Sequence, residues 1–178
     1  MLTECPWMFY PAAKRPPAWV PSFVEAFERV LPQIDSTRVG ANSDDVLAAV
    51  RPGLESIGYI VEASKAARDR LDRPVLFKEQ GQAEVTYEPD AFLPDEGVVV
   101  EVEAGRAASN NAVYRDLIRA SLMVDVAYLA AVVPVEYWNN ERTKRYAQVY
   151  DKELSNLRAI FSSGRLQLPL EGVLLLGY

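Results

Sequence analysis

Three carboxylates in a short stretch of the chain are the strongest chemical signal in the sequence. Asp90 precedes a turn, and Glu101 and Glu103 alternate with valines after that turn. Alternate side chains of a strand share a face, so Glu101 and Glu103 point the same way as Val99. The sequence contains no histidine, and carboxylate oxygens are ligands of hard cations. The three residues therefore predict a site for Mg²⁺ or Mn²⁺ rather than for zinc.

A β-hairpin is expected to bring these carboxylates together. Its first arm runs from about Glu84 to Phe92, its turn covers residues 93–97, and its second arm runs from Val98 to Ala104. Pro and Gly in the turn supply a fixed φ and a positive φ, respectively. The second arm has valines on both faces, which is typical of a strand that is covered on both sides.

The same stretch is compatible with an ordinary acidic edge strand. Charged residues on an edge prevent strand-to-strand aggregation, and Pro89-Asp90 is a common turn pair. Glu101 and Glu103 are harder to explain in this way, because two carboxylates on a buried face need an opposite charge.

The pair Pro89-Asp90, followed by Glu101-Val102-Glu103, resembles the motif of the PD-(D/E)xK nucleases. The match is best to type II restriction endonucleases of the BamHI and BglII type, in which another residue replaces the usual lysine. The segment 110–117 is similar to the helix that follows the motif in those enzymes. The resemblance covers roughly residues 84–134 and is carried by a short motif.

This resemblance implies a metal-dependent endonuclease for double-stranded DNA that works as a homodimer and leaves 5′-phosphate and 3′-hydroxyl ends. Asp90 and Glu101 would be the principal ligands of Mg²⁺, which would polarise the scissile phosphate and activate water. Glu103 stands where most relatives have lysine. It would orient or deprotonate water, or complete a second metal site. Asp44 or Glu55, on an earlier helix, could add a ligand, although a solvated helix face is the more ordinary interpretation.

Arginines near the motif are the candidates for nucleic-acid contacts. Arg115 and Arg119 are four residues apart and share a helix face, so they either meet phosphate or pair with the acidic residues. Arg106 follows the second arm directly and is the third candidate. The densest basic run indicates either solvated charges or a contact with the DNA backbone, and consists of Lys65, Arg68, Arg70 and Arg73.

The composition predicts one globular domain over residues 1–178, and the alternation of expected helices and strands predicts that it is α/β. The chain is 49% hydrophobic and 25% charged, which is enough for a core. A net charge of −6 argues against a broad nucleic-acid surface, but a bound cation would offset part of it. The single cysteine, Cys5, excludes an internal disulfide and fits a reducing cytoplasm. We find no signal peptide and no apolar run long enough for a membrane.

The expected fold is a restriction-endonuclease-like mixed sheet flanked by helices, preceded by an extended, Pro- and aromatic-rich arm at residues 1–21. Ser22 is expected to cap the first helix, and Pro52 to kink or break the second. Expected helices cover 23–31, 42–58, 111–125 and 142–161; expected strands besides the hairpin cover 59–61, 75–77, 128–133 and 173–176.

Two other classes of protein fit the same sequence. One is a non-catalytic protein with the nuclease fold that binds nucleic acid or a protein partner. The other is a small structural or interaction protein whose contact surface is the arm at residues 1–21. A homodimer is expected in each case, because that arm and the all-apolar segment Val173–Leu176 exceed what a small domain readily covers.

Overall fold

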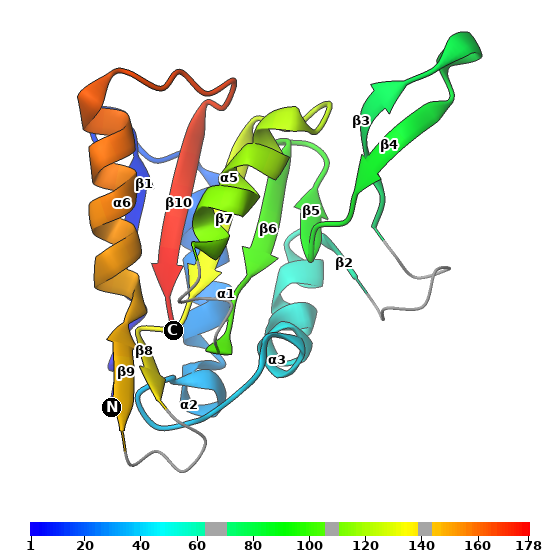
Figure 1. Cartoon of the computed structure of the whole chain (residues 1–178). Coiled ribbons are helices and arrows are strands. Elements are labelled where there is room, and N and C mark those ends of the chain that lie inside the picture. The colour runs from blue at the N-terminus through cyan, green and yellow to red at the C-terminus, as the bar shows by residue number, and fades with distance from the viewer. Residues whose placement is uncertain (63–70, 106–110, 139–143) are drawn as a thin grey trace.

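A mixed six-stranded sheet forms the centre of the computed structural model, which describes residues 1–62, 71–105, 111–138 and 144–178 (Figure 1). The strand order is β1-β10-β7-β6-β5-β2, in which β6, β7 and β10 are parallel and the other pairs are antiparallel. The strands are β1 (Trp7–Tyr10), β2 (Ile60–Val61), β5 (Ala91–Leu93), β6 (Val98–Val102), β7 (Tyr128–Val133) and β10 (Gly172–Gly177). The prediction of an α/β fold with a mixed sheet is confirmed.

Helices cover both faces of this sheet and form two apolar layers. One layer packs α1 (Trp19–Glu28), α2 (Leu31–Ile34) and α3 (Ser43–Ser56) against the sheet, and the other packs α5 (Ala112–Leu122) and α6 (Val149–Ser163). The alternation of β6 assigns its side chains to these layers as predicted. Val98, Val100 and Val102 lie in the first layer, and Val99 lies in the second.

The hairpin that was expected to start at Glu84 is shorter than predicted. Only β5 pairs with β6, whereas β4 (Ala83–Tyr87) pairs with β3 (Arg73–Phe77) in a separate two-stranded ribbon that extends away from the main sheet (Figure 1). The 3₁₀ turn η2 (Glu79–Gly81) joins the two ribbon strands. Pro89 cannot donate a ladder hydrogen bond, which is consistent with the change of sheet between β4 and β5.

The first two predicted helices differ from the structure in detail. α1 begins at Trp19, and the Ser22 hydroxyl donates to the Trp19 carbonyl oxygen (3.0 Å) inside the helix, so the predicted cap at Ser22 is wrong. The predicted start of α3 is confirmed, because the Asn42 side chain accepts from the Asp45 amide (2.9 Å) in a capping box. α3 continues through Pro52 to Ser56, so the predicted break is wrong.

The last predicted helix starts later than expected. Residues 145–148 form β9 (Arg145–Gln148), which pairs with β8 (Glu136–Trp138), and α6 begins at Val149. The pairing with β8 overrides the apolar spacing that suggested a helix. Gly164 ends α6 in the left-handed conformation.

The N-terminal arm contributes an edge strand. β1 pairs antiparallel with β10, so the apolar segment Val173–Leu176 lies in the interior of the sheet between β1 and β7. Most of the apolar surface that suggested a homodimer is thus covered within one chain, although Trp7 remains 41% exposed. Among the described residues, no helix has both the length and the apolar character needed to cross a membrane.

Candidate active site

Asp90 is fixed against the end of β6 by its backbone and its side chain. Its amide donates to the Val100 carbonyl oxygen (3.1 Å), and its carbonyl oxygen accepts from the Glu62 amide (2.9 Å). Its carboxylate oxygen Oδ2 accepts from the Val102 amide (2.6 Å). The hairpin therefore brings Asp90 next to the strand that carries Glu101 and Glu103, as the sequence predicted.

Glu101 and Glu103 are both buried and are paired with arginines of α5. Arg119 Nη1 lies 3.8 Å from Glu101 Oε1, and Arg115 Nη2 donates to Glu103 Oε1. Of the two expectations for these arginines, the structure forms the pairing with the acidic residues. No contact with phosphate is needed to explain where the two guanidiniums lie.

Asp116 is a fourth carboxylate of the site and was not among the predicted site residues. It is 1% exposed, and its Oδ1 accepts from Arg115 Nε (3.0 Å). Helical spacing could have indicated that Asp116 is buried, since the buried residues of α5 recur at i, i+3, i+4 and i+7. Ile118 and Leu122 lie outside this spacing and are 51% and 48% exposed. The buried face of α5 consists of Ala112, Val113, Asp116, Leu117 and Ala120.

Arg119 also connects the site to the β3–β4 ribbon. Its Nη2 donates to the Glu88 carbonyl oxygen (3.1 Å), and its guanidinium lies 5.1 Å from the centre of the Tyr87 ring. A cation at this distance from an aromatic face is stabilised by the ring. Arg119 is therefore held at three points, whereas the side chain of Arg115 is 54% exposed.

The carboxyl groups of the site hold protons more tightly than usual. Burial raises the pKa of Asp90 to about 6, aided by the charges of Glu62, Asp116 and Asp44 and opposed by the Val102 amide. Burial likewise raises the pKa of Glu101 well above its ordinary value, with Asp90 adding to the effect and Arg119 opposing it.

Glu103 and Asp116 titrate together. Burial raises the pKa of Glu103 to about 7, the charge of Asp116 raises it further, and Arg115 lowers it. Burial also raises the pKa of Asp116, against the opposing effect of Arg115. Arg115 contacts both carboxylates, so a proton taken up by either one belongs to the pair.

The charges within this cluster do not balance when every carboxylate is ionised. Two guanidiniums face four carboxylates, which leaves two negative charges in a buried site. Glu101 Oε1 and Asp116 Oδ2 have no hydrogen-bond partner among the described residues. Two protons or one divalent cation would neutralise the cluster, and the unpartnered oxygens fit either role.

The arrangement of the carboxylates limits what a cation would find. Among the described residues, no three Asp, Glu or Cys side chains form a group that is arranged to hold a metal ion. Asp90 Oδ2 accepts a hydrogen bond from the Val102 amide, and Glu103 Oε1 accepts one from Arg115. Glu101 Oε1 and Asp116 Oδ2 are therefore the buried oxygens of the cluster that have no hydrogen-bond partner among the described residues. The assignment of Asp90 and Glu101 to the metal stays a prediction.

Other predicted site residues are placed less favourably or not described. Asp44 is near enough for its charge to raise the pKa of Asp90, whereas Glu55 is exposed on the last turn of α3. Arg73 lies over the Phe92 ring, 4.0 Å from its centre, as a packing contact. The remaining basic candidates lie outside the described residues: Lys65, Arg68, Arg70 and Arg106.

No protein-family model matches the sequence, and no curated protein matches it either. The function of the chain is therefore inferred from its own site and fold.

Proposed function

We propose that the protein is a metal-dependent endonuclease that hydrolyses phosphodiester bonds of double-stranded DNA. The observation that carries this proposal is the cluster of Asp90, Glu101, Glu103 and Asp116, which has two more carboxylates than guanidiniums. Such an excess of buried negative charge suits a divalent cation, and metal-assisted hydrolysis is the reaction that a carboxylate-bound Mg²⁺ supports.

The order of the elements supports the same proposal. α3 leads into β2, the β3–β4 ribbon follows, and the chain then forms the β5–β6 hairpin, α5 and β7, which is parallel to β6. Apart from the ribbon, this is the order of helix, strand, hairpin, helix and strand expected from the nuclease resemblance. Glu101 and Glu103 lie at the carboxyl end of β6, where open α/β sheets bind their ligands.

The residues would divide the chemistry among them. Asp90 and Glu101 would hold Mg²⁺, which supplies charge stabilisation at the phosphate and a more acidic water when it is bound. Glu103 has a pKa raised to about 7, mainly by burial, so it can accept or donate a proton near neutral pH. Arg115 and Asp116 fix the orientation of Glu103. The exposed side of Arg115 is free to turn toward a phosphate oxygen.

Calorimetry with Mn²⁺, together with cleavage of mixed-sequence plasmid DNA, tests the proposal. We expect Mn²⁺ to bind the wild type and to stabilise it by mass action, and we expect cleavage to need the metal. Absence of Mn²⁺ binding would remove the catalytic assignment altogether. Because a single plasmid can lack a rare recognition sequence, the cleavage assay uses several unrelated duplexes.

A homodimer is part of this proposal, because duplex DNA presents two strands related by a twofold axis. An exposed apolar row on α5 offers a surface for the second copy: Tyr114, Ile118 and Leu122 are 38%, 51% and 48% exposed and recur every four residues. Light scattering should give twice the mass of the 19.9 kDa chain, and Ile118→Glu should halve it. A single-chain mass for the wild type across micromolar concentrations would contradict the dimer.

A non-catalytic protein with the nuclease fold is the second candidate. The observation in its favour is that Arg115 bridges Glu103 and Asp116, so part of the cluster is neutralised without any metal. Protons on Glu101 and Asp90 would complete the neutralisation. Binding of DNA that is unaffected by Mn²⁺ would favour this candidate over the nuclease.

A further inference from the structure

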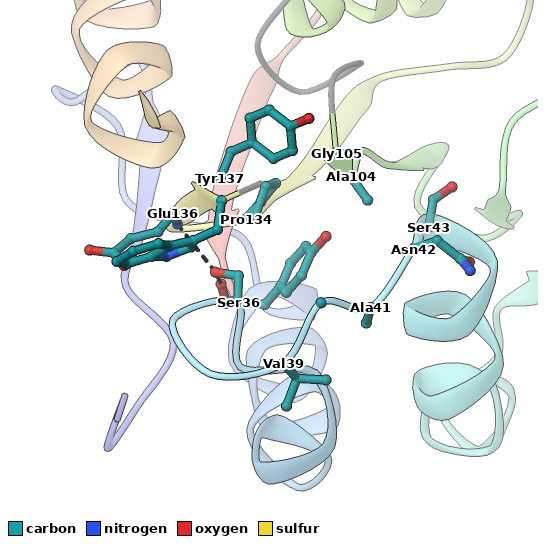
Figure 2. A pocket seen from close by; sticks show the side chains of 13 residues that line it. Ser36, Val39, Ala41, Asn42, Ser43, Ala104, Gly105, Pro134, Glu136 and Tyr137 are labelled. Carbon is teal, nitrogen blue, oxygen red and sulfur yellow. Dashed lines mark hydrogen bonds between the residues drawn. The ribbon is translucent and has the colours of Figure 1, made fainter. Parts of the chain in front are cut away.

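A cavity of about 540 Å³ lies just beyond the carboxyl ends of the three parallel strands. Ala104 and Gly105 follow β6, Pro134 follows β7, and Tyr178 follows β10. The opposite wall is the segment from Ser36 to Ser43, which leads into α3, as Figure 2 shows. The volume falls in the range of pockets that hold small organic ligands.

The cavity has aromatic walls whose positions are fixed. Glu136 accepts from the Trp138 indole Nε1 (2.8 Å) and from Arg145 Nη1 (2.7 Å), which holds the indole and neutralises the carboxylate. Tyr137 and the buried Tyr178 add two further rings to the lining. Flat π-faces held in place suit a planar aromatic ligand at a low entropic cost.

Hydrogen bonds through Ser36 tie the two walls together. The Ser36 hydroxyl accepts from the amide of Glu136 (3.2 Å) (Figure 2). It also accepts from the amide of Val135 (2.9 Å) and donates to the Tyr178 carbonyl oxygen. The cavity is therefore built by interactions that join three separate parts of the chain.

The polarity of the lining indicates which kind of chemical group the cavity would bind. None of the described lining residues is Lys or Arg, so the described part of the lining offers no cation to a phosphate group. Asn42, Ser43 and Ser36 offer amide and hydroxyl groups next to the aromatic rings. An uncharged heterocycle with hydrogen-bonding edges fits this combination, whereas a phosphate does not.

The cavity adjoins the carboxylate cluster through β6. Ala104 directly follows Glu103, and the Tyr178 hydroxyl donates to the Glu103 carbonyl oxygen (3.0 Å). The cavity and the carboxylate cluster therefore meet at the backbone of residues 103 and 104, at the same end of the sheet.

We propose that this cavity binds a nucleobase of the polynucleotide strand, turned out of its stack beside the carboxylate cluster. The inference rests on the proposed nuclease function and deepens it, because it assigns a base-binding site to the same end of the sheet. Stacking on Trp138 and Tyr137 would compensate for the loss of base stacking in the strand. A free nucleoside carries the same kind of base, and the competition experiment below distinguishes it from a polynucleotide strand.

Binding of short single-stranded oligonucleotides in a chelator tests the inference without involving the metal. The wild-type protein should bind a mixed-sequence oligonucleotide roughly tenfold more tightly than an abasic strand of the same length. Trp138→Ala and Tyr137→Ala should each remove most of that difference. Trp7→Ala, which removes an exposed Trp that does not line the cavity, should preserve it.

Equal binding of the two strands by the wild type, or no binding of either, overturns the inference even if a variant fails to fold. Deoxynucleosides that compete as well as the oligonucleotide at equal base concentration would identify a free nucleoside as the ligand, and would also overturn it. The two proposals fail separately. Base-dependent binding without metal-dependent cleavage would reject only the nuclease, and cleavage with equal binding of both strands would reject only the base pocket.

Discussion

Asp35 and Glu101 are both buried carboxylates, but they differ in the hydrogen-bond donors that surround them. Asp35 is 3% exposed and Glu101 is 6% exposed. Asp35 accepts hydrogen bonds from the amides of Leu2 (3.0 Å) and Thr37 (2.9 Å) and from the Thr37 hydroxyl (2.6 Å). Glu101 has one arginine at 3.8 Å, and its Oε1 lacks a hydrogen-bond donor among the described residues.

Their pKa values move in opposite directions as a result. Burial acts to raise the pKa of Asp35, but the hydrogen bonds from Thr37 and Leu2 outweigh it and leave that pKa lowered. Burial and the neighbouring Asp90 raise the pKa of Glu101 well above its ordinary value. A carboxylate that serves the fold is supplied with donors, whereas one that lacks donors is held at a cost and is a candidate for function.

The largest expected difference between the two carboxylates is in catalysis. Glu101→Gln and Asp90→Asn should each lower the rate of metal-dependent cleavage by at least about a hundredfold, because each removes ligand charge worth several kcal/mol at the reacting phosphate. Asp35→Asn should leave the rate per folded molecule unchanged. The measurement is plasmid cleavage in Mg²⁺. Full activity of Glu101→Gln would remove Glu101 from the reaction.

Glu103→Gln sharpens the same experiment. Glutamine keeps the shape of the side chain but cannot take up a proton, so lost activity would make Glu103 a base or a metal ligand. Retained activity would make it a residue that only orients water.

The next largest effect is on stability, where replacing Asp35 should matter more than replacing Glu101. Asp35→Ala should lower the free energy of unfolding by about 2–4 kcal/mol, because three partly buried donors lose a charged acceptor. Glu101→Gln should raise it by about 1 kcal/mol in a chelator, since it removes repulsion between neighbouring carboxylates. Urea unfolding measures both. Asp95→Ala, at an exposed turn position, is the control, and a stabilising Asp35→Ala would contradict the comparison.

The placement of Glu101 could be predicted from the sequence, whereas the hydrogen bonding of Asp35 could not. Alternation along Val98–Val102 places Glu101 and Glu103 on one face, because the strand period is two wherever the strand is buried. The three carboxylates of the motif are close in sequence and are joined by a turn. Their placement thus depends on local rules.

The features that could not be predicted from the sequence depend mainly on contacts between distant segments. The donors of Asp35 include the amide of Leu2, far away in the chain, and no local pattern indicates that pairing. The departure of β4 from the hairpin depends on its pairing with β3. Asp116 was missed for a different reason: its helical position is buried, but its charge suggested the surface. A charged residue in the apolar stripe of a helix is better read as buried and paired.

The pH dependence of stability follows from two further carboxylates of the cluster. Asp90 and Glu103 have folded pKa values raised to about 6 and about 7 from ordinary values of 3.8 and 4.5, mainly by burial. The folded state therefore binds more protons between about pH 4 and pH 7, and its stability falls as the pH rises through that window. We expect a loss on the order of 1–2 kcal/mol, after allowance for solvent screening.

Chemical denaturation at several pH values in a chelator measures this loss. Mn²⁺ should flatten the profile, because the cation replaces the protons, and its affinity should rise with pH over the same range. Asp35 acts in the other direction, since its lowered pKa makes its contribution disappear only below its ordinary value of 3.8. Stability that is constant from pH 4 to 7 in the chelator would show that the cluster is solvated.

The smallest expected effect separates the two arginines of α5. Arg115 is 54% exposed, whereas Arg119 is 25% exposed and bonded to the Glu88 carbonyl oxygen. Arg115 can therefore reach a DNA phosphate, while Arg119 is held against the sheet. Arg115→Ala should reduce the salt dependence of duplex binding by about one counterion, or roughly three- to fourfold in affinity between 50 and 200 mM salt.

Arg119→Ala should leave that slope unchanged and should instead lower stability, because Glu101 would lose its nearest cation. Both slopes are measured by titration of labelled duplex in Ca²⁺ at increasing salt. Equal slopes for the wild type and Arg115→Ala would confine Arg115 to its pairing with Glu103 and Asp116. A slope that changes only with Arg119→Ala would reverse the assignment of the two residues, since it would require the guanidinium held by Glu88 to be the one that turns to the DNA.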